Sequence, residues 1–223
     1  PIGSATGNTI DDVIVLDNNQ PGTVKYFITP TLDGCSGNVH EFLVNIDPLP
    51  VPGITEQSGV PLCKDATLTY STEPLKNSYS WQALPDGVIA GSPPYGYQVT
   101  VTWPTSGAKT LQVNYIEPTT LCTAATASLF NTTINPLPSP GISQQIGATL
   151  CPGSAITYTT EPGKINYDWQ VSPDGAIAET PPYSNQVTIS FPTSGLKTVS
   201  VNYTDPATLC AAADHTDFQL TIN

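Results

Sequence analysis

The sequence contains no arginine and few charged residues of either sign. Charged residues make up 11% of the 223 positions, and the six basic residues, all Lys, face 18 acidic ones, for a formal net charge of −12. Binding of nucleic acid needs clustered cations that displace counterions from phosphates. This composition therefore argues against nucleic acid as a partner, and the same sign of charge disfavours an anionic membrane surface.

Long apolar runs are also missing from the sequence. No stretch of about eighteen apolar residues is present, so we expect no membrane-spanning segment. No charged segment followed by an apolar one marks a signal peptide at the start of the chain. We therefore expect no insertion into a membrane.

What the chain does have is a duplication without gaps. Residues 52–135 recur as residues 140–223 at an offset of 88, which is the difference between Cys63 and Cys151. Tandem copies of one unit are typical of arrays, which supply length or many equivalent contacts rather than one catalytic pocket. Because the chain begins at Pro1 rather than Met and stops inside the repeating pattern, we expect it to be an excerpt of a longer, processed protein.

Apolar residues alternate with polar ones along each unit, which indicates half-buried β-strands. No segment has a sustained helical period, and six or seven short strands in about ninety residues predict an all-β sandwich. The turn Pro85-Asp86-Gly87 is expected to use a positive φ at Gly87. The predicted core positions of the second unit are Leu68, Tyr70, Tyr79, Trp81, Tyr97, Val99, Val101, Trp103, Leu111, Val113, Tyr115, Phe130 and Ile134.

Two proline-rich junctions, residues 45–50 and 135–138, separate the units. They predict a partial first unit over residues 1–48, a second unit over 49–136 and a third over 137–223. Proline fixes φ and restricts the preceding residue, so we expect short, semi-rigid spacers and a rod-like array of sandwiches. Alternatively, these prolines serve only to stop edge strands from pairing with other chains.

Residues 1–50 align only with the second half of a unit. We expect strands around Val13 and Val15, over residues 24–28 and over residues 42–46, with a turn at Gly34. Such a fragment exposes an apolar face, so our hypothesis is that the rest of this unit precedes Pro1 and carries the partner of Cys35. A closed core around a buried, unpaired Cys35 would contradict it.

Cysteine usage points to an oxidising compartment. Each full unit contains two cysteines, which predicts the disulfides Cys63–Cys122 and Cys151–Cys210. Two buried free thiols per unit are the alternative. The spacing fits no zinc signature, because only two His are present and no CxxC pair occurs. Trp81 and its counterpart Trp169 are expected in the cores, packed on these disulfides as in related sandwiches.

Five segments of the chain, residues 24–37, 46–50, 99–113, 150–154 and 167–169, contain short motifs in a consistent order. They resemble PKD-like repeats of giant surface adhesins of Bacteroidota. Residues 24–37 are similar to the closing segment of such repeats and residues 46–50 to their junction. Residues 150–154 are similar to their opening segment, residues 167–169 to a strand with the pattern YxW, and residues 99–113 to a strand pair. The resemblance implies an immunoglobulin-like sandwich in an exported cell-surface protein, most similar to gliding-motility adhesins of the type IX secretion route. The C-terminal sorting domain and the WDFGDG signature of true PKD domains are both missing.

Catalysis finds little support in the sequence. The only histidines are His40 and His215, and His215 replaces Ala127 of the preceding copy, so both are expected to be surface residues. Recurring carboxylates could form a glycosidase-type pair, but their place in Thr-Glu-Pro and Pro-Asp-Gly turns explains them as turn residues. These carboxylates are Glu73, Glu161, Asp86 and Asp174.

Two kinds of ligand remain open from the sequence. The acidic cluster of Asp11, Asp12, Asp17 and Asn18 could hold Ca²⁺, although no calcium loop is present and a solvated surface loop explains it as well. Tyr95 and Tyr183 each follow a Pro pair, where an aromatic ring could stack on a sugar or simply pack in the unit.

We therefore expect a non-enzymatic stalk or adhesion segment of a large secreted surface protein, used in gliding motility or attachment, with neighbouring repeats as its partners. A module that binds glycan or calcium on the substratum is the first alternative. An accessory domain of a secreted hydrolase is the second.

Overall fold

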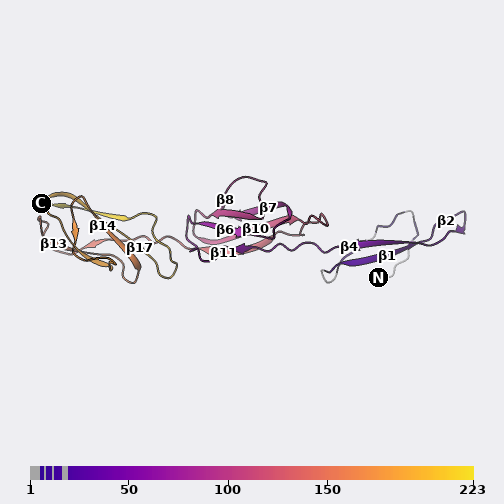
Figure 1. The fold of residues 1–223 in the computed structure, drawn as a ribbon, viewed down its shortest axis with the longest axis horizontal. Helices are drawn as coiled ribbons and strands as arrows, with labels where there is room; N and C mark the ends of the chain where they lie inside the picture. Colours follow the sequence, from indigo (N-terminus) through magenta and orange to yellow (C-terminus); the bar gives the residue numbers. More distant parts are fainter. Residues whose placement is uncertain (1–5, 8, 12, 17–19) are drawn as a thin grey trace.

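The computed structural model describes residues 6–7, 9–11, 13–16 and 20–223. Within these residues the chain forms strands and turns, with no α-helix, and therefore no helix that is long and apolar enough to span a membrane. Three parts follow one another along the long axis of the molecule (Figure 1): a hairpin near the N-terminus, a middle sandwich and a C-terminal sandwich.

The middle sandwich consists of one four-stranded and one three-stranded sheet. The four-stranded sheet has the order β5-β6-β9-β8 and the three-stranded sheet the order β11-β10-β7. This arrangement of four and three antiparallel strands is that of an immunoglobulin constant-type domain, so the expected fold class is confirmed. The strands are β5 Thr55–Glu56, β6 Thr67–Ser71, β7 Asn77–Leu84, β8 Val88–Ile89, β9 Gln98–Thr102, β10 Gly107–Ile116 and β11 Ser128–Ile134.

The C-terminal sandwich repeats this topology strand for strand. Its sheets have the orders β12-β13-β16-β15 and β14-β17-β18, which are the orders of the middle sandwich with each strand replaced by its counterpart. The strands are β12 Ser143–Gln144, β13 Ala155–Thr159, β14 Ile165–Ser172, β15 Ala176–Ile177, β16 Gln186–Ser190, β17 Gly195–Thr204 and β18 Thr216–Ile222.

Each sandwich has its own hydrophobic core. In β10, buried residues alternate with half-buried ones from Lys109 to Ile116, which is the period of two that the sequence predicts. Trp81 on β7 and Trp169 on β14 are both buried, as expected. Tyr97 differs from its predicted place, because it lies just before β9 and is 47% exposed.

Gly87 is required for space rather than for its φ. The turn Pro85-Asp86-Gly87 was expected to use a positive φ at Gly87, but Gly87 is not among the residues with that conformation. A Cβ at this position would lie 2.5 Å from the Cβ of Ala83 and 2.5 Å from the ring of Trp103. The glycine therefore lets the turn pack closely on the core.

The N-terminal part is a long hairpin without a core. Strands β1 (Gly22–Ile28) and β4 (His40–Ile46) pair along their whole length, and between them β2 (Thr31–Leu32) and β3 (Cys35–Ser36) flank a turn with φ of 81° at Gly34. The strand expected at Val13 and Val15 is wrong, since residues 13–16 are not paired with any strand. An isolated segment without a partner cannot satisfy its backbone groups as a strand.

Of the residues described in 1–50, none is buried. Phe27, Phe42 and Leu43 are each more than half exposed, and Cys35 is exposed and free. The closed core that would contradict the hypothesis of a partial unit is therefore not found in this part of the structure. The position of the missing half stays a prediction.

Candidate functional site at the junction of the two sandwiches

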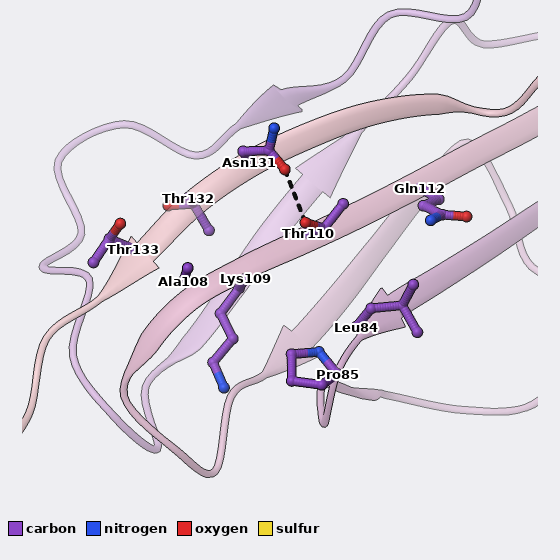
Figure 2. Close-up of a pocket in the computed structure, with 9 residues that line it drawn as sticks. All are labelled: Leu84, Pro85, Ala108, Lys109, Thr110, Gln112, Asn131, Thr132 and Thr133. Carbon is purple, nitrogen blue, oxygen red and sulfur yellow. Dashed lines mark hydrogen bonds between the residues drawn. The ribbon is translucent and has the colours of Figure 1, made fainter.

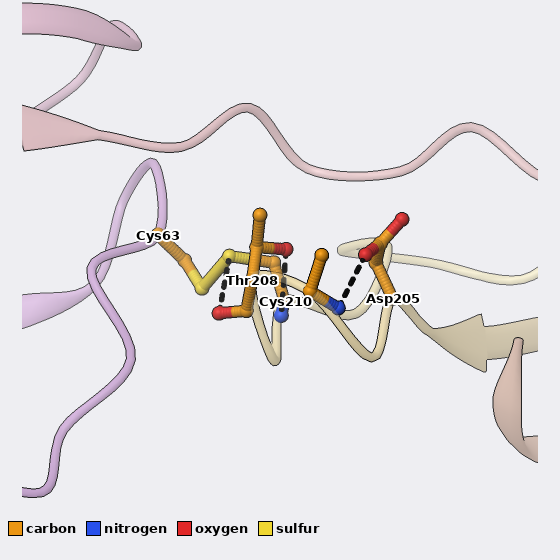
Figure 3. Close-up of a disulfide and its surroundings, with 5 residues drawn as sticks. Cys63, Asp205, Thr208 and Cys210 are labelled. Carbon is orange, nitrogen blue, oxygen red and sulfur yellow. Dashed lines mark hydrogen bonds between the residues drawn. A yellow bond between two sulfur atoms is a disulfide. The ribbon is translucent and has the colours of Figure 1, made fainter.

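A disulfide joins the two sandwiches where they meet end to end. Cys63 of the middle sandwich is bonded to Cys210 of the C-terminal sandwich, with a Cα–Cα distance of 5.7 Å and a sequence separation of 147. Figure 3 shows the two cysteines approaching from separate segments of the chain. The bond therefore links the two sandwiches independently of the backbone that connects them.

Backbone hydrogen bonds fix the loop that carries Cys63. Asn135, the residue after β11, donates its N–H to the carbonyl of Leu62 at 2.7 Å, and Lys64 donates to the carbonyl of Asn135 at 2.8 Å. Ala66 donates to the carbonyl of Cys63 at 3.1 Å, which closes the turn. These bonds hold Cys63 beside the residue at which the chain leaves the middle sandwich.

A second hydrogen-bond network holds Cys210. The loop after β17 is closed by the N–H of Asp205 on the carbonyl of Cys210 at 2.8 Å, and Cys210 donates its own N–H to Thr208 Oγ1 at 3.3 Å. Asp205 also accepts from the N–H of Ala207 through its side chain at 2.9 Å, the contact drawn in Figure 3. The loop thus presents Cys210 from a defined backbone.

An ion pair anchors this loop to the sandwich. Lys164 Nζ lies 2.5 Å from Asp205 Oδ2, and each side chain is 25% exposed. The hydrogen bond from Lys164, followed by the backbone bond from Ala207, lowers the pKa of the Asp205 carboxyl below its ordinary value. The Asp205 carboxylate therefore stays ionised at neutral pH, and its contact with Lys164 ties the Cys210 loop to the segment before β14.

The backbone connection across the junction is short and anchored at both ends. Asn135 is bonded to the middle sandwich, and Gly141 donates its N–H to both carboxylate oxygens of Glu161 in the C-terminal sandwich, at 3.0 and 3.1 Å. Burial opposes ionisation of Glu161, but hydrogen bonds from Thr160, Gly141 and its own backbone prevail and lower its pKa. Glu73 binds Gly53 in the same way at the preceding junction. The two glutamates thus bind the chain where it enters each sandwich from the junction, a role beyond the turn chemistry expected for them.

The pairing expected within each unit is wrong. Cys63 lies beside Asn135 at the end of β11, whereas Cys122 lies in the loop before β11 begins. Seven strand residues separate these two ends, or about 20 Å at the rise of a β-strand, and a disulfide needs Cα atoms within about 7 Å. Each unit therefore has its two cysteines at opposite ends of the sandwich along its strands, which we call its poles.

Three cysteines carry free thiols: Cys35 and Cys151, which are exposed, and Cys122, which is half-buried. Trp81 and Trp169 are core residues as predicted, but the disulfides within the units on which they were expected to pack are not formed. The indole N–H of Trp81 instead donates to the carbonyl of Gly96 at 3.0 Å. Because the two cysteines of each unit recur at equivalent positions, the sequence is compatible with disulfides within a unit and with disulfides between neighbouring units. Only the directions of the strands, which place the two cysteines at opposite ends of a unit, could have distinguished these two pairings.

The two recurring aspartates expected at turns, Asp86 and Asp174, accept hydrogen bonds from Lys and Thr side chains of their own sandwich. Asp86 accepts from Thr105 and from the nearly buried Lys109, whose Nζ lies 2.5 Å from Asp86 Oδ1. The bond from Lys109, then that from Thr105, lowers the pKa of Asp86. Asp174 has the same partners in the C-terminal sandwich, Lys197 and Thr193. These aspartates fasten the turn after β7, or β14, to the sheet.

His215 lies on the sheet surface, where its Nε2 is 2.8 Å from Asp168 Oδ2. His40 begins β4 on the exposed hairpin. Neither histidine has a serine or cysteine nucleophile among its hydrogen-bond partners in the described part of the chain. This is the arrangement expected of surface histidines.

A groove of about 580 Å³ runs along β7, β10 and β11 (Figure 2). Its lining contains no Asp, Glu, His or Cys, and its one ionisable side chain, Lys109, is bonded to Asp86. Thr110 and Asn131 in the groove are bonded to each other at 2.8 Å. The lining therefore offers no carboxyl, imidazole or thiol group, and its one amine is already paired.

The possible calcium cluster cannot be located as a group. Asp12, Asp17 and Asn18 lie outside the described residues, and Asp11 is exposed. Within the described residues no three His, Cys, Asp or Glu side chains are grouped so that they could hold a metal ion.

Tyr95 and Tyr183, the candidate glycan contacts, are half-buried against their cores. Each forms an isolated β-bridge, with Tyr79 and Tyr167 respectively. Each side chain thus packs partly against its own core, and a role in binding sugar stays a prediction.

The fold and the junction together define a pair of immunoglobulin-like sandwiches that are cross-linked end to end. A model of the PKD-like domain family matches residues 2–50, less than half of the chain. The match falls on the partial first unit, where residues 24–37 resemble the closing segment of PKD-like repeats. No curated protein matches the sequence.

Solved structures with a related layout share little sequence with the chain. The D0-D1 domain of intimin is 16% identical with a TM-score of 0.29, covering 75% of this chain and 99% of that one. Fibronectin(III)-like modules of Clostridium thermocellum CbhA are 15% identical with a TM-score of 0.36, covering 77% and 94%. Similarity at this level carries no conclusion about ligands or about how the units are arranged.

Proposed function

We propose that the chain is a non-enzymatic stalk segment of a large secreted surface adhesin. The observation that carries this proposal is the Cys63–Cys210 bond, which adds a second covalent link to a junction already tethered by a short proline-rich connection. Two links at different points of one interface resist bending and twisting far better than one. A disulfide between domains also requires an oxidising compartment, as outside the cell.

The acidic surface and the repeated sandwiches support the same role. With a net charge of −12, parallel fibres repel one another and stay soluble. Neighbouring repeats are the partners of each unit, and a surface polysaccharide is the partner we propose for the whole adhesin, in gliding or attachment. Nucleic acid and the membrane interior have no part in this function.

Small-angle X-ray scattering of the oxidised chain tests the stiff junction. We expect one narrow distribution of distances between the sandwiches, which broadens in the double variant Cys63→Ser, Cys210→Ser. The matched control, Cys122→Ser with Cys151→Ser, removes as many cysteines but keeps the bond, so its distribution stays narrow. Equal flexibility of all three proteins would refute the stalk.

Direct binding of glycan is the alternative, and Tyr95 and Tyr183 are its test residues. Glycan arrays that show binding by the native chain, lost on changing both tyrosines to Ala, would favour it. A melting temperature that rises with Ca²⁺ would favour a calcium-binding module. The stalk role predicts neither result.

A further inference from the structure

Cys151 lies on a loop built like the loop of Cys63. The residue after the last strand donates to the residue before the cysteine in both cases: Asn223 to Leu150 at 2.8 Å, and Asn135 to Leu62 at 2.7 Å. The turn after each cysteine is closed by a bond of 3.1 Å to its carbonyl. The residue two positions on has a positive φ, 79° at Gly153 and 64° at Asp65.

At the other pole, Cys122 lies on a loop built like that of Cys210. Its N–H donates to Thr120 Oγ1 at 3.3 Å, as Cys210 does to Thr208, and its sulfur lies 3.6 Å from the Thr120 carbonyl oxygen, against 3.7 Å for Cys210 and Thr208. The residue before each cysteine, Leu121 or Leu209, has a φ of 59°. The ion pair Lys76–Glu117 anchors the loop, as Lys164–Asp205 does.

Each sandwich therefore has one loop of the Cys63 kind at the pole where its chain leaves, and one loop of the Cys210 kind at the opposite pole. The structure contains one occupied pair of these loops, Cys63 with Cys210. The exposed thiol of Cys151 lies beside the C-terminal residue, Asn223, on the free pole of the last sandwich.

We propose that the Cys151 loop is the docking site for a further sandwich of the same kind, which bonds to it through the cysteine of its Cys210-type loop. The half-buried Cys122 is, by the same geometry, the acceptor for the unit that precedes it. The proposal rests on the end-to-end arrangement of the stalk, and it makes the disulfide a repeating link rather than a single staple.

Formation of this link needs an oxidant, and we name a small-molecule disulfide such as glutathione disulfide. The thiolate of Cys151 attacks one sulfur of the oxidant, forms a mixed disulfide and releases one glutathione thiol. The incoming thiolate then attacks the Cys151 sulfur and releases the second glutathione. Two protein thiols are thus oxidised to one disulfide while one glutathione disulfide is reduced to two thiols.

Pairing of Cys151 with Cys210 or of Cys122 with Cys63 is excluded by the occupied bond. Pairing of Cys122 with Cys151 would need contact between the outer poles of two sandwiches that already meet at their inner poles. The thiols that remain can therefore bond only to cysteines beyond these two sandwiches.

A longer chain tests the proposal directly. Residues 136–223 are appended after Asn223, which recreates the proline junction and adds two cysteines. After equilibration with glutathione, denaturation and thiol labelling, we expect three free thiols, the number in the 223-residue chain, because a second disulfide has formed at Cys151. Five free thiols, or a bond from Cys151 to any residue other than the appended Cys210, would overturn the proposal.

Two further proteins keep the test decisive. The longer chain with Cys151→Ser in its first copy should show four free thiols, and its thermal unfolding reports whether the appended unit folds without the bond. A chain extended instead with residues 48–135 should again show three, with Cys151 bonded to the appended Cys122. If scattering shows a stiff junction but the numbers of free thiols differ from those expected, the proposed function stands and only this inference is overturned.

Discussion

One buried tyrosine has different surroundings in the two sandwiches. Tyr70 donates its hydroxyl to Glu56 at 2.8 Å and accepts from the indole N–H of Trp103 at 3.3 Å. Its counterpart Tyr158 faces Phe191 and Gln144 at the equivalent positions, and its buried hydroxyl has no hydrogen-bond partner among the described residues. Burial without a partner also raises the pKa of Tyr158 to about 12.

Replacing these tyrosines by Phe should therefore have opposite effects. Tyr158→Phe removes an unsatisfied buried hydroxyl and should raise the free energy of unfolding by about 1 kcal/mol. Tyr70→Phe leaves the Trp103 N–H without an acceptor and should lower it by about 1–2 kcal/mol. Urea unfolding followed by tryptophan fluorescence measures both, and an equal loss in the two variants would contradict this account.

The turn aspartates make stability depend on pH on the acid side. Hydrogen bonds from Lys109 and Lys197 lower the pKa values of Asp86 and Asp174 below those of the unfolded chain. A lowered pKa contributes stability that is present above the unfolded pKa, about 3.9, and is lost as the pH falls through the folded pKa.

We therefore expect the melting temperature to decrease as the pH is lowered below about 4. In the double variant Asp86→Asn, Asp174→Asn, the melting temperature should be lower at pH 7, since two nearly buried ammonium groups lose their carboxylate partners. The decrease of the melting temperature in acid should also be shallower. Asp33→Asn in the exposed hairpin turn is the control. An acid decrease of unchanged depth in the double variant would show that other carboxyls cause it.

At the scale of single elements, the strands could be predicted from the sequence, but the positions of the cysteine loops at the poles of each sandwich could not. The alternation in residues 97–103 and 111–115 predicts β9 and β10, because the period of two follows directly from burial of one sheet face. The loops that hold Cys63 and Cys210 contain no such period. The position of each loop depends on the end of the sandwich to which its neighbouring strand runs. The disulfide depends in addition on a neighbouring sandwich, which no local sequence pattern describes.

The ion pair on the Cys210 loop should affect the redox equilibrium of the junction. Lys164→Met removes the anchor of Asp205, so the loop samples more conformations when reduced and the equilibrium constant for closing Cys63–Cys210 against glutathione should fall roughly two- to fivefold. Mass spectrometry of alkylated samples at fixed glutathione ratios measures the oxidised fraction.

The other sandwich provides the matched control for this change. Lys76→Met removes the equivalent pair with Glu117, on a loop whose Cys122 is free. It should leave the equilibrium of Cys63–Cys210 unchanged. A similar decrease in both variants would mean that the effect is general destabilisation.

At the scale of the whole molecule, the junction bond redirects tension. Force applied at the two termini passes from Cys63 through the disulfide to Cys210 and bypasses the residues between them, which include nearly all of both cores. In the chain-entropy model, closing a loop of this length adds about 5 kcal/mol against complete unfolding. The bond therefore protects both sandwiches at once.

Single-molecule pulling should show this bypass. Reduction of the disulfide should add about 500 Å to the final extended length, because the 147-position loop becomes free to extend. Cys63→Ser should behave as the reduced chain even under oxidising conditions, and Cys122→Ser as the oxidised one. An extended length that is the same before and after reduction would contradict the bypass.

The most direct test of the account is peptide mapping of the oxidised chain with its free thiols blocked. Trypsin places Cys63 in residues 26–64, Cys210 in residues 198–223, and both Cys122 and Cys151 in residues 110–164; cleavage before Asp47 then separates Cys35 from Cys63. We predict that the Cys63 peptide is joined to the Cys210 peptide while residues 110–164 are recovered with two blocked thiols. Residues 110–164 joined to both of the other peptides would mean that each sandwich closes its own disulfide, and the cross-linked junction would be wrong.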